Sequence, residues 1–334
     1  MAEAPCQKII CMNDLISVVV PTYNRALLIT DALDSVYAQS YRPMELIVVD
    51  DGSTDETETV VKQWQAAHTN NDFEVQFVQQ QNQGGNPARN NGIGHASGKY
   101  IAFLDSDDAW HPEKLTKQLS CFDDPEVGGV YCGVQHMNFT TGKILEPSKR
   151  SYPEGWLLES MLIRDITAQT SAYIIRKDVF EKVGQFDVTL QARQDWDMWI
   201  RLASAFKIAA VPEILVNFRE HTGIRTASNP MKEISAYRAI RKKYAHLLKQ
   251  VSLSCRLQAR SSYWKRMGRV HYKHDSLKTS KGYLYACGAI LVWPFDFDAW
   301  AAGLGMLLPK NFRQNLHRTW NTIFGATPFA IRSH

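Results

Sequence analysis

Cysteine, signal-like segments and long apolar runs are all scarce in this 334-residue sequence. The six cysteines are scattered and form no Cys-x-x-Cys pair, which argues against a structural zinc site or a disulfide framework and fits a reducing cytoplasm. No apolar run follows a basic N-terminal region, so we expect no signal peptide. The uncharged run from Gly282 to Phe295 has fourteen residues, fewer than the roughly 20 that a membrane-spanning helix needs.

Two common phosphate-binding motifs are also missing. No G-x-G-x-x-G follows the first predicted strand, and no Walker lysine is present. A dinucleotide-binding domain or a P-loop enzyme would therefore lack the loop that cradles its phosphates. We expect a metal ion and arginine side chains to contact the phosphates of any nucleotide that binds.

Apolar strands and amphipathic helices alternate through the first hundred residues. The predicted strands are Leu15 to Val20, Glu45 to Val49, Phe73 to Gln79 and Tyr100 to Leu104. This alternation predicts βαβ units in an α/β fold, with a mostly parallel central sheet flanked by helices and ligands at the carboxyl ends of the strands. Further strands are predicted over 128–134, 170–176 and 209–219.

Three carboxylates follow the fourth predicted strand. Asp105, Asp107 and Asp108 come directly after its apolar residues, so the strand delivers clustered negative charge to one edge of the sheet. Crowded carboxylates repel one another unless a cation sits between them. Oxygen ligands favour a hard divalent metal, Mg²⁺ or Mn²⁺, that keeps substrate phosphates as further ligands. The alternative for an isolated Asp-x-Asp is a solvated acidic turn.

Four motifs, in this order, resemble those of the family 2 glycosyltransferases, which have the GT-A fold. They are Val20 to Arg25 (VPTYNR), Val49 to Asp55 (VDDGSTD), Ala88 to Asn90 (ARN) and Leu104 to Asp108 (LDSDD). The similarity continues as far as Arg225. It implies inverting transfer of a sugar from a nucleotide-diphosphate donor, usually UDP-linked, with a divalent metal as cofactor.

The resemblance also implies roles for the residues that would bind the donor. Pro21, Thr22 and Tyr23 would line the base pocket, where the Tyr23 ring offers a face for stacking. Asp51 would accept hydrogen bonds from the base or the ribose, and Arg89 would lie near the base and the diphosphate. A core position for Tyr23 and a helix-capping turn around Asp51 are the alternatives.

The remaining donor-side roles concern the metal. By the same resemblance, Asp105 would contact the ribose or the sugar and Asp107 would bind the metal. His221 lies in a segment similar to the family's Arg-x-His-x-Gly, whose histidine reaches the metal or the diphosphate from a loop, and neutral imidazole is a common ligand. The alternative for His221 is a solvated loop histidine.

A predicted helix beginning at Gln194 resembles the family's Glu-Asp-x-Asp-x-x-x-Arg-Leu segment, whose second acid is the general base. Asp195 is that residue here, and a carboxylate at a helix N-terminus is held ionised by the helix dipole. The family's preceding glutamate is replaced by Gln194, which we interpret as tuning or acceptor choice. Asp197 and Arg201 are four residues apart and are expected to pair along the helix.

The chain changes character after residue 228. We expect an N-terminal tail over 1–14, a glycosyltransferase domain over 15–228 and a basic, aromatic-rich helical extension over 229–334. Between Tyr237 and Lys281, thirteen lysines and arginines accompany one acid, so this segment carries +12 in a chain of net charge +4. Such helices suit an anionic membrane surface, although they could equally form a cap on the catalytic domain. No nucleic-acid-binding module is recognised.

These features predict a glycosyltransferase that moves a sugar to a hydroxyl of a glycan or lipid-linked acceptor in surface or extracellular polysaccharide synthesis. The enzyme would be cytoplasmic, or peripheral on the inner face of the cytoplasmic membrane. A non-catalytic sugar-nucleotide binder or scaffold is one alternative. A nucleotidyltransferase is another, although it would need a basic glycine-rich loop after the first strand.

Overall fold

The computed structural model describes residues 14–146, 151–220, 230–274 and 280–293. The chain divides into two compact units, residues 1–240 and 241–334. Within the described ranges, no helix is both long and apolar enough to cross a lipid bilayer.

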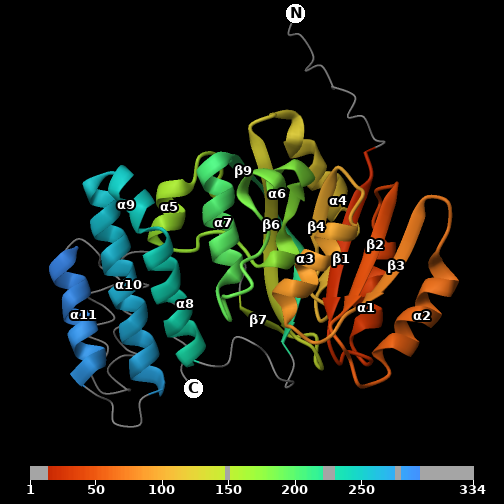
Figure 1. Ribbon diagram of the computed structural model, residues 1–334, viewed down its shortest axis with the longest axis horizontal. Helices are drawn as coiled ribbons and strands as arrows, with labels where there is room; N and C mark the ends of the chain where they lie inside the picture. The colour runs from red at the N-terminus through yellow and green to blue at the C-terminus, as the bar shows by residue number, and fades with distance from the viewer. Residues whose placement is uncertain (1–13, 147–150, 221–229, 275–279, 294–334) are drawn as a thin grey trace, which may run out of the picture. The chain divides into compact units, whose positions relative to one another are not determined.

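The first unit contains a nine-stranded mixed sheet in the order β3-β2-β1-β4-β8-β6-β9-β5, with β7 paired to β6 (Figure 1). Its strands are β1 (Ile16–Thr22), β2 (Met44–Asp50), β3 (Phe73–Gln79), β4 (Tyr100–Phe103), β5 (Ala109–Trp110), β6 (Val127–Asn138), β7 (Ile144–Glu146), β8 (Ile174–Arg176) and β9 (Lys207–Glu220). Strands β3, β2, β1 and β4 are parallel, as predicted. Strand β8 is antiparallel to both its neighbours, so the second half of the sheet is mixed.

The α-helices in the described ranges are α1 (Ile29–Tyr37), α2 (Thr57–His68), α3 (Gly85–His95), α4 (Lys114–Leu119), α5 (Leu158–Ile163), α6 (Lys177–Val183), α7 (Gln194–Ala205), α8 (Pro230–Lys243), α9 (Ala245–Gln250), α10 (Leu253–His274) and α11 (Ser280–Val292). Helices α1, α2 and α3 follow the alternation predicted for the first hundred residues, and α8 to α11 follow one another without an intervening strand in the described part of the chain.

Successive side chains of β1 point to opposite faces of the sheet, where different helices cover them. Val18 and Val20 belong to the core cluster that also contains Leu33 of α1. Val19 faces α3 instead, and a Cβ added at Gly92 would come within 2.3 Å of its Cγ1. This close approach requires glycine on α3 and explains why β1 reads as apolar at every position, because both its faces are buried.

One predicted strand is wrong in its first half. The segment predicted as a strand over 170–176 begins as a 3-10 turn at Thr170–Ala172, and β8 starts only at Ile174. The turn leaves Ser171 free to bond outside the sheet ladder. Its backbone carbonyl accepts from Trp110 Nε1 at 2.8 Å. Its hydroxyl donates to Asp108, in the turn formed by residues 105–108, which we call the acidic turn.

In the second unit, α10 and α11 lie side by side (Figure 1). Gly288 of α11 is buried, and a Cβ there would lie 1.9 Å from the Trp264 ring of α10, so the two helices pack closely at that point. Leu284 and Leu291 of α11 are 70% and 82% exposed, respectively. Helix α11 therefore has one face against α10 and an apolar face that no described residue covers.

Candidate functional site

The site lies where β1, β2 and β4 end. The backbone N–H of Asp51 donates to the Thr22 carbonyl at 2.9 Å, which holds the ends of β2 and β1 together. The Asp51 carboxylate is buried and accepts from the backbone N–H groups of Gln83 at 2.9 Å and Gly84 at 2.7 Å. Asp51 therefore fixes the glycine-rich loop that leads into α3, while Asp50 fixes its own turn by accepting from the Ser53 N–H at 3.1 Å.

Tyr23 and Thr22 present contrasting surfaces at the end of β1. Tyr23 is 44% exposed, so it is not the core aromatic that was the alternative for this residue. Thr22 is buried, and its hydroxyl oxygen has no hydrogen-bond partner among the described residues. Pro21 is buried beside them and pairs with Val49 of β2. An exposed ring and an unsatisfied hydroxyl thus stand next to each other on the same strand end.

Arg89 joins α3 to the acidic turn. Its guanidinium is buried and donates from Nη2 to Asp105 Oδ1, whereas its Nε has no partner among the described residues. A buried donor without a partner is costly, typically about 1–3 kcal/mol. Arg89 Nε is thus both unpartnered among the described residues and shielded from solvent in this structure.

The three carboxylates of the acidic turn have different environments. Asp108 is fully buried and accepts from the Ser171 hydroxyl at 2.6 Å. Burial, followed by the charges of Asp105 and Asp107, raises the pKa of Asp108 well above its ordinary value. Asp107 keeps 17% of its side chain exposed and lies 3.9 Å from Nη2 of Arg25. Of the three carboxylates, Asp105 and Asp107 are the ones that a ligand can reach.

These residues fit a divalent metal held jointly with a phosphate ligand. Burial is the main reason that the pKa of Asp108 is raised, and the charges of Asp105 and Asp107 raise it further, so a cation would relieve that part of the repulsion. No group of three or more His, Cys, Asp or Glu side chains suited to holding a metal occurs in the described part of the chain. Mg²⁺ typically takes one or two carboxylates and completes its shell with water and substrate phosphates. Asp107 could supply such a carboxylate, while His221 lies outside the described residues.

Arg219, at the end of β9, braces the acidic turn from the other side. Its Nε donates to the Asp107 carbonyl at 2.9 Å, its backbone N–H reaches Asp108 Oδ1 at 3.4 Å, and its Nη1 bonds to Asp31 of α1. Strand β9 thereby fixes the turn that follows β4. Arg219 and Asp107 are 112 positions apart, and no local sequence pattern predicts their contact.

Asp195 occupies the first turn of α7, as predicted. Its Oδ1 accepts from the Trp196 N–H at 2.8 Å. Arg193, immediately before the helix, adopts a left-handed backbone (φ 58°) and donates to Glu233 at 2.7 Å. Burial alone would lower the pKa of Arg193, but Tyr237, Glu233 and Asp195 together hold that pKa above its ordinary value. Asp195 therefore sits beside a permanent cation at a helix N-terminus.

Asp197, Arg201 and Gln194 are the other residues of the predicted α7 motif. Asp197 is buried and bonds to Arg201 at 3.0 Å, which confirms the predicted pair. Arg201 also donates to the Val183 carbonyl at 2.6 Å, which ties α7 to the end of α6. Gln194 has a buried Oε1 without a partner among the described residues.

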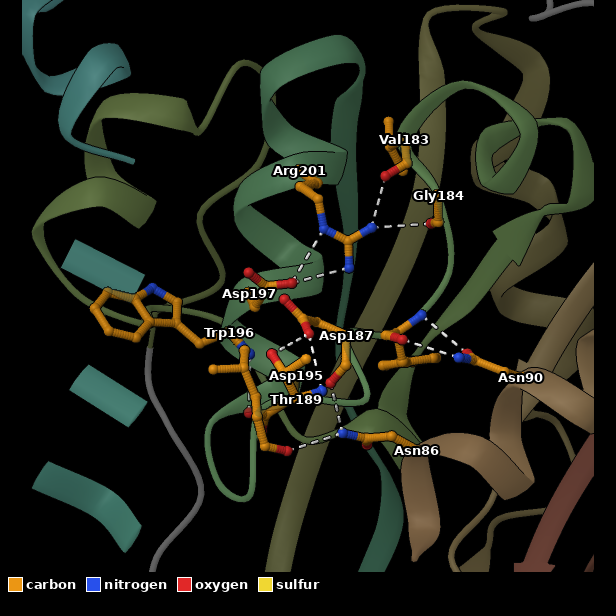
Figure 2. Close-up of polar contacts among 12 residues, drawn as sticks. Asn86, Asn90, Val183, Gly184, Asp187, Thr189, Asp195, Trp196, Asp197 and Arg201 are labelled. Atoms are coloured by element: carbon orange, nitrogen blue, oxygen red, sulfur yellow. Dashed lines mark hydrogen bonds and ion pairs between the residues drawn. The ribbon is translucent and has the colours of Figure 1, made fainter. Parts of the chain in front are cut away.

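Two asparagines of α3 connect the donor side to the Asp195 side (Figure 2). Asn90 exchanges two hydrogen bonds of 2.9 Å with the backbone of Phe186, and Asn86 donates to the carbonyls of Asp187 and Leu190 at 3.1 and 3.2 Å. The sequence feature that could have indicated these contacts is the pair of asparagines one helical turn apart, one of them in the Ala-Arg-Asn motif.

Comparison with known proteins identifies relatives of this chain. A model described as glycosyl transferase family 2 matches residues 17–184. The putative teichuronic acid biosynthesis glycosyltransferase TuaG of Bacillus subtilis is 32% identical over 208 residues, covering 61% of this chain and 79% of the relative. An Escherichia coli protein, the UDP-Glc:alpha-D-GlcNAc-diphosphoundecaprenol beta-1,3-glucosyltransferase WfgD, is 28% identical over 204 residues, covering 60% of this chain and 74% of the relative.

The fold also matches solved structures. S. aureus TarS 1–349, crystallised in complex with UDP-GlcNAc, superposes with a TM-score of 0.58 at 17% identity, covering 91% of this chain and 92% of that one. At that identity the match concerns the fold alone, and it agrees with the predicted GT-A arrangement of a sheet flanked by helices.

Proposed function

We propose that this chain, which belongs to glycosyltransferase family 2, transfers a sugar from a UDP-linked donor to an acceptor hydroxyl with inversion. It is a transferase related to enzymes of cell-surface polysaccharide synthesis. The observation that carries the proposal is the convergence at one sheet edge. The exposed ring of Tyr23, the unpartnered Thr22 hydroxyl and the buried guanidinium of Arg89 lie at the ends of β1 and β4 with the acidic turn. This set offers stacking, hydrogen bonding and charge to a nucleoside diphosphate.

On the donor side, we assign Pro21, Thr22, Tyr23 and Asp51 to the base and ribose. Asp51 accepts three hydrogen bonds from the loop before α3. We therefore expect Asp51 and this loop to contact the base together. Arg89, whose guanidinium bonds to Asp105, would lie near the base and the diphosphate.

Metal binding would fall to Asp107, with Asp105 contacting the ribose or the sugar and His221 as a further ligand. When bound, Mn²⁺ or Mg²⁺ would act as a Lewis acid toward the leaving nucleoside diphosphate. Arg25, 3.9 Å from Asp107, and Arg219, bonded to its carbonyl, hold this carboxylate in place.

Asp195 would act as the general base. It lies in the first turn of α7, directly after Arg193 and Gln194. The acceptor hydroxyl would give its proton to Asp195 while its oxygen attacks the anomeric carbon from the face opposite the diphosphate. The bond to the diphosphate oxygen breaks, which inverts the configuration.

Two further parts of the proposal concern the acceptor and the location. The relative WfgD is named for an undecaprenol-linked acceptor, and we propose a lipid-linked or glycan acceptor here. The basic helices and the exposed apolar face of α11 would then place the enzyme on the inner face of the cytoplasmic membrane. Nucleic acid is not a proposed partner.

A nucleotide-release screen tests this proposal. The purified full chain is incubated with individual UDP- and GDP-sugars, with and without Mn²⁺, and free nucleotide is measured. We expect metal-dependent release of UDP from at least one donor, and loss of that release in Asp107→Asn. Calorimetric binding of UDP without release from any donor would instead support the non-catalytic binder.

A further inference from the structure

A second polar cluster lies at the same sheet edge, where β6 and β9 end. It consists of His136 near the end of β6, Glu220 at the end of β9, and Gln169 just before the 3-10 turn. His136 Nδ1 is 3.2 Å from Glu220 Oε1, and its Nε2 is 3.3 Å from Gln169 Nε2. We call these three residues the His136 cluster.

The strand register places the His136 cluster close to the acidic turn. Asn217 of β9 pairs with Gln135 of β6 on one side and with Ala109 of β5 on the other. Neighbouring strands lie about 4.8 Å apart, so Gln135 and Ala109 are about 10 Å apart across β9. His136 follows Gln135, and Asp108 precedes Ala109, so the cluster and the carboxylates are separated by about the length of a sugar ring and its substituents.

The same cluster is also connected to the helix that bears Asp195. The carbonyl of Ala168, next to Gln169, accepts from Trp199 Nε1 of α7 at 3.2 Å. Trp199 in turn stacks on Tyr173 with ring centroids 3.6 Å apart. Asp195 is among the charges that act on the buried Tyr173 hydroxyl, which places α7, Tyr173 and the 165–169 segment in one packed group.

The hydrogen-bond directions in the cluster are set by chemistry. The amide nitrogen of Gln169 can only donate, so His136 Nε2 accepts, and the ring proton is on Nδ1, where it is donated to Glu220. A carboxylate that orients an imidazole in this way fixes its tautomer. The side chains of His136 and Glu220 remain 24% and 33% exposed, and the Phe218 ring lies 4.7 Å from the imidazole.

We propose that the His136 cluster binds the acceptor sugar, an inference that rests on the proposed function. An apolar ring beside a carboxylate, an imidazole and an amide matches a pyranose, which has apolar C–H faces and hydroxyl groups that both donate and accept. The nearby carboxylates would repel a negatively charged acceptor sugar. We therefore assign a neutral sugar as the acceptor.

The test separates acceptor binding from donor binding. With a donor identified by nucleotide release, transfer to a panel of neutral p-nitrophenyl glycosides is measured for wild type, His136→Ala, Gln169→Ala and Glu220→Gln. We expect the acceptor KM to rise by about tenfold or more in both alanine variants and less in Glu220→Gln, whose amide oxygen can still accept from Nδ1–H. Affinity for UDP with Mn²⁺, measured by calorimetry, should be unchanged in all three.

The control is His95→Ala, at the far end of α3, where His95 is exposed and its Nδ1 lies 3.0 Å from the Asn91 carbonyl. It should leave the acceptor KM and UDP affinity at wild-type values. An unchanged acceptor KM in both alanine variants, or an equal loss of UDP affinity, would overturn the assignment. Absence of nucleotide release by the wild-type enzyme would instead overturn the proposed function.

Discussion

Arg219 Nε donates to the backbone carbonyl of Asp107 at 2.9 Å, so a residue of β9 holds the turn that follows β4. Arg219→Lys keeps the charge but loses the planar group that reaches several acceptors at once. We expect the affinity for UDP with Mn²⁺ to fall by about tenfold, since one to two hydrogen bonds are lost, and calorimetry would measure it.

Asp31→Asn is the matched control, because it weakens only the ion pair at Arg219 Nη1, where Asp31 is 58% exposed. Exposed pairs contribute about 0–1 kcal/mol, so this variant should bind UDP within about fivefold of wild type. Equal losses in the two variants would show that UDP affinity depends on the ion pair between Arg219 and Asp31, rather than on the contact of Arg219 with the turn.

Asp195→Asn preserves the shape of the side chain but removes its ability to take a proton. Sugar transfer should fall by roughly 10²–10⁴-fold, with UDP affinity nearly intact. Single-turnover transfer and calorimetry on the same preparation would measure both. Transfer at the wild-type rate would assign the general base to another residue.

Two glycines of α3 provide a matched pair for the packing of this helix on β1. Gly92→Ala places a Cβ 2.3 Å from Val19 Cγ1, so we expect a loss of about 1–3 kcal/mol in the free energy of unfolding. Gly94 has open space around its Cα, and Gly94→Ala should stabilise the helix by about 0.5–1 kcal/mol. Urea denaturation would test both, and equal effects would contradict the close approach.

Lys114 makes the stability of the protein depend on pH. Burial lowers the pKa of Lys114 to about 8, although its ammonium contacts Gln118 Oε1 at 2.7 Å and lies 4.0 Å from the Trp110 ring centroid. Between about pH 8 and 10.5 the unfolded chain holds this proton and the folded chain does not, so the free energy of unfolding rises with pH in that window.

Comparing wild type with Lys114→Met in urea isolates this contribution from other titrating groups. The difference between the two proteins should shift in favour of wild type by about 2 kcal/mol from pH 7.5 to 9.5. Lys117→Met, on the same helix, is a control that should leave the rise in place. Parallel pH profiles for wild type and Lys114→Met would contradict the buried-cation interpretation.

The second unit should bind anionic membranes. Leu284, Cys287 and Leu291 of α11 are exposed at helical spacing, and the segment from Tyr237 to Lys281 carries +12. Each basic residue near an anionic leaflet contributes about 1 kcal/mol. We expect the full chain to co-sediment with phosphatidylserine vesicles at low salt and to dissociate at high salt. Leu284→Ser/Leu291→Ser should weaken binding, whereas unchanged sedimentation would exclude this face.

The sequence predicted the elements that follow local rules. The strands of the parallel half, the α7 boundary at Gln194 and the Asp197–Arg201 pair follow from periodicity and spacing. The antiparallel insertion of β8 and the turn at Ser171 do not follow from such local rules. Ser171 forms hydrogen bonds with Asp108 and Trp110, which are more than sixty positions away in the sequence.

The site was predictable to the same extent. Motif residues indicated which side chains meet at the sheet edge, since parallel strands share their carboxyl ends. The contacts of Arg219, Asn86 and Asn90 depend on pairings between distant segments, for which one sequence has no local signal.

The pairing of β5 with β9 has a consequence for how the molecule is made. Every motif residue of the acidic turn is synthesised by position 108, yet among the strands that the structure describes β5 pairs only with β9, through Ala109 and Asn217. During synthesis, the turn can reach its final geometry only after the ribosome has released residue 220. A nascent chain that stalls after β8 would carry the donor motifs without the strand that shapes them.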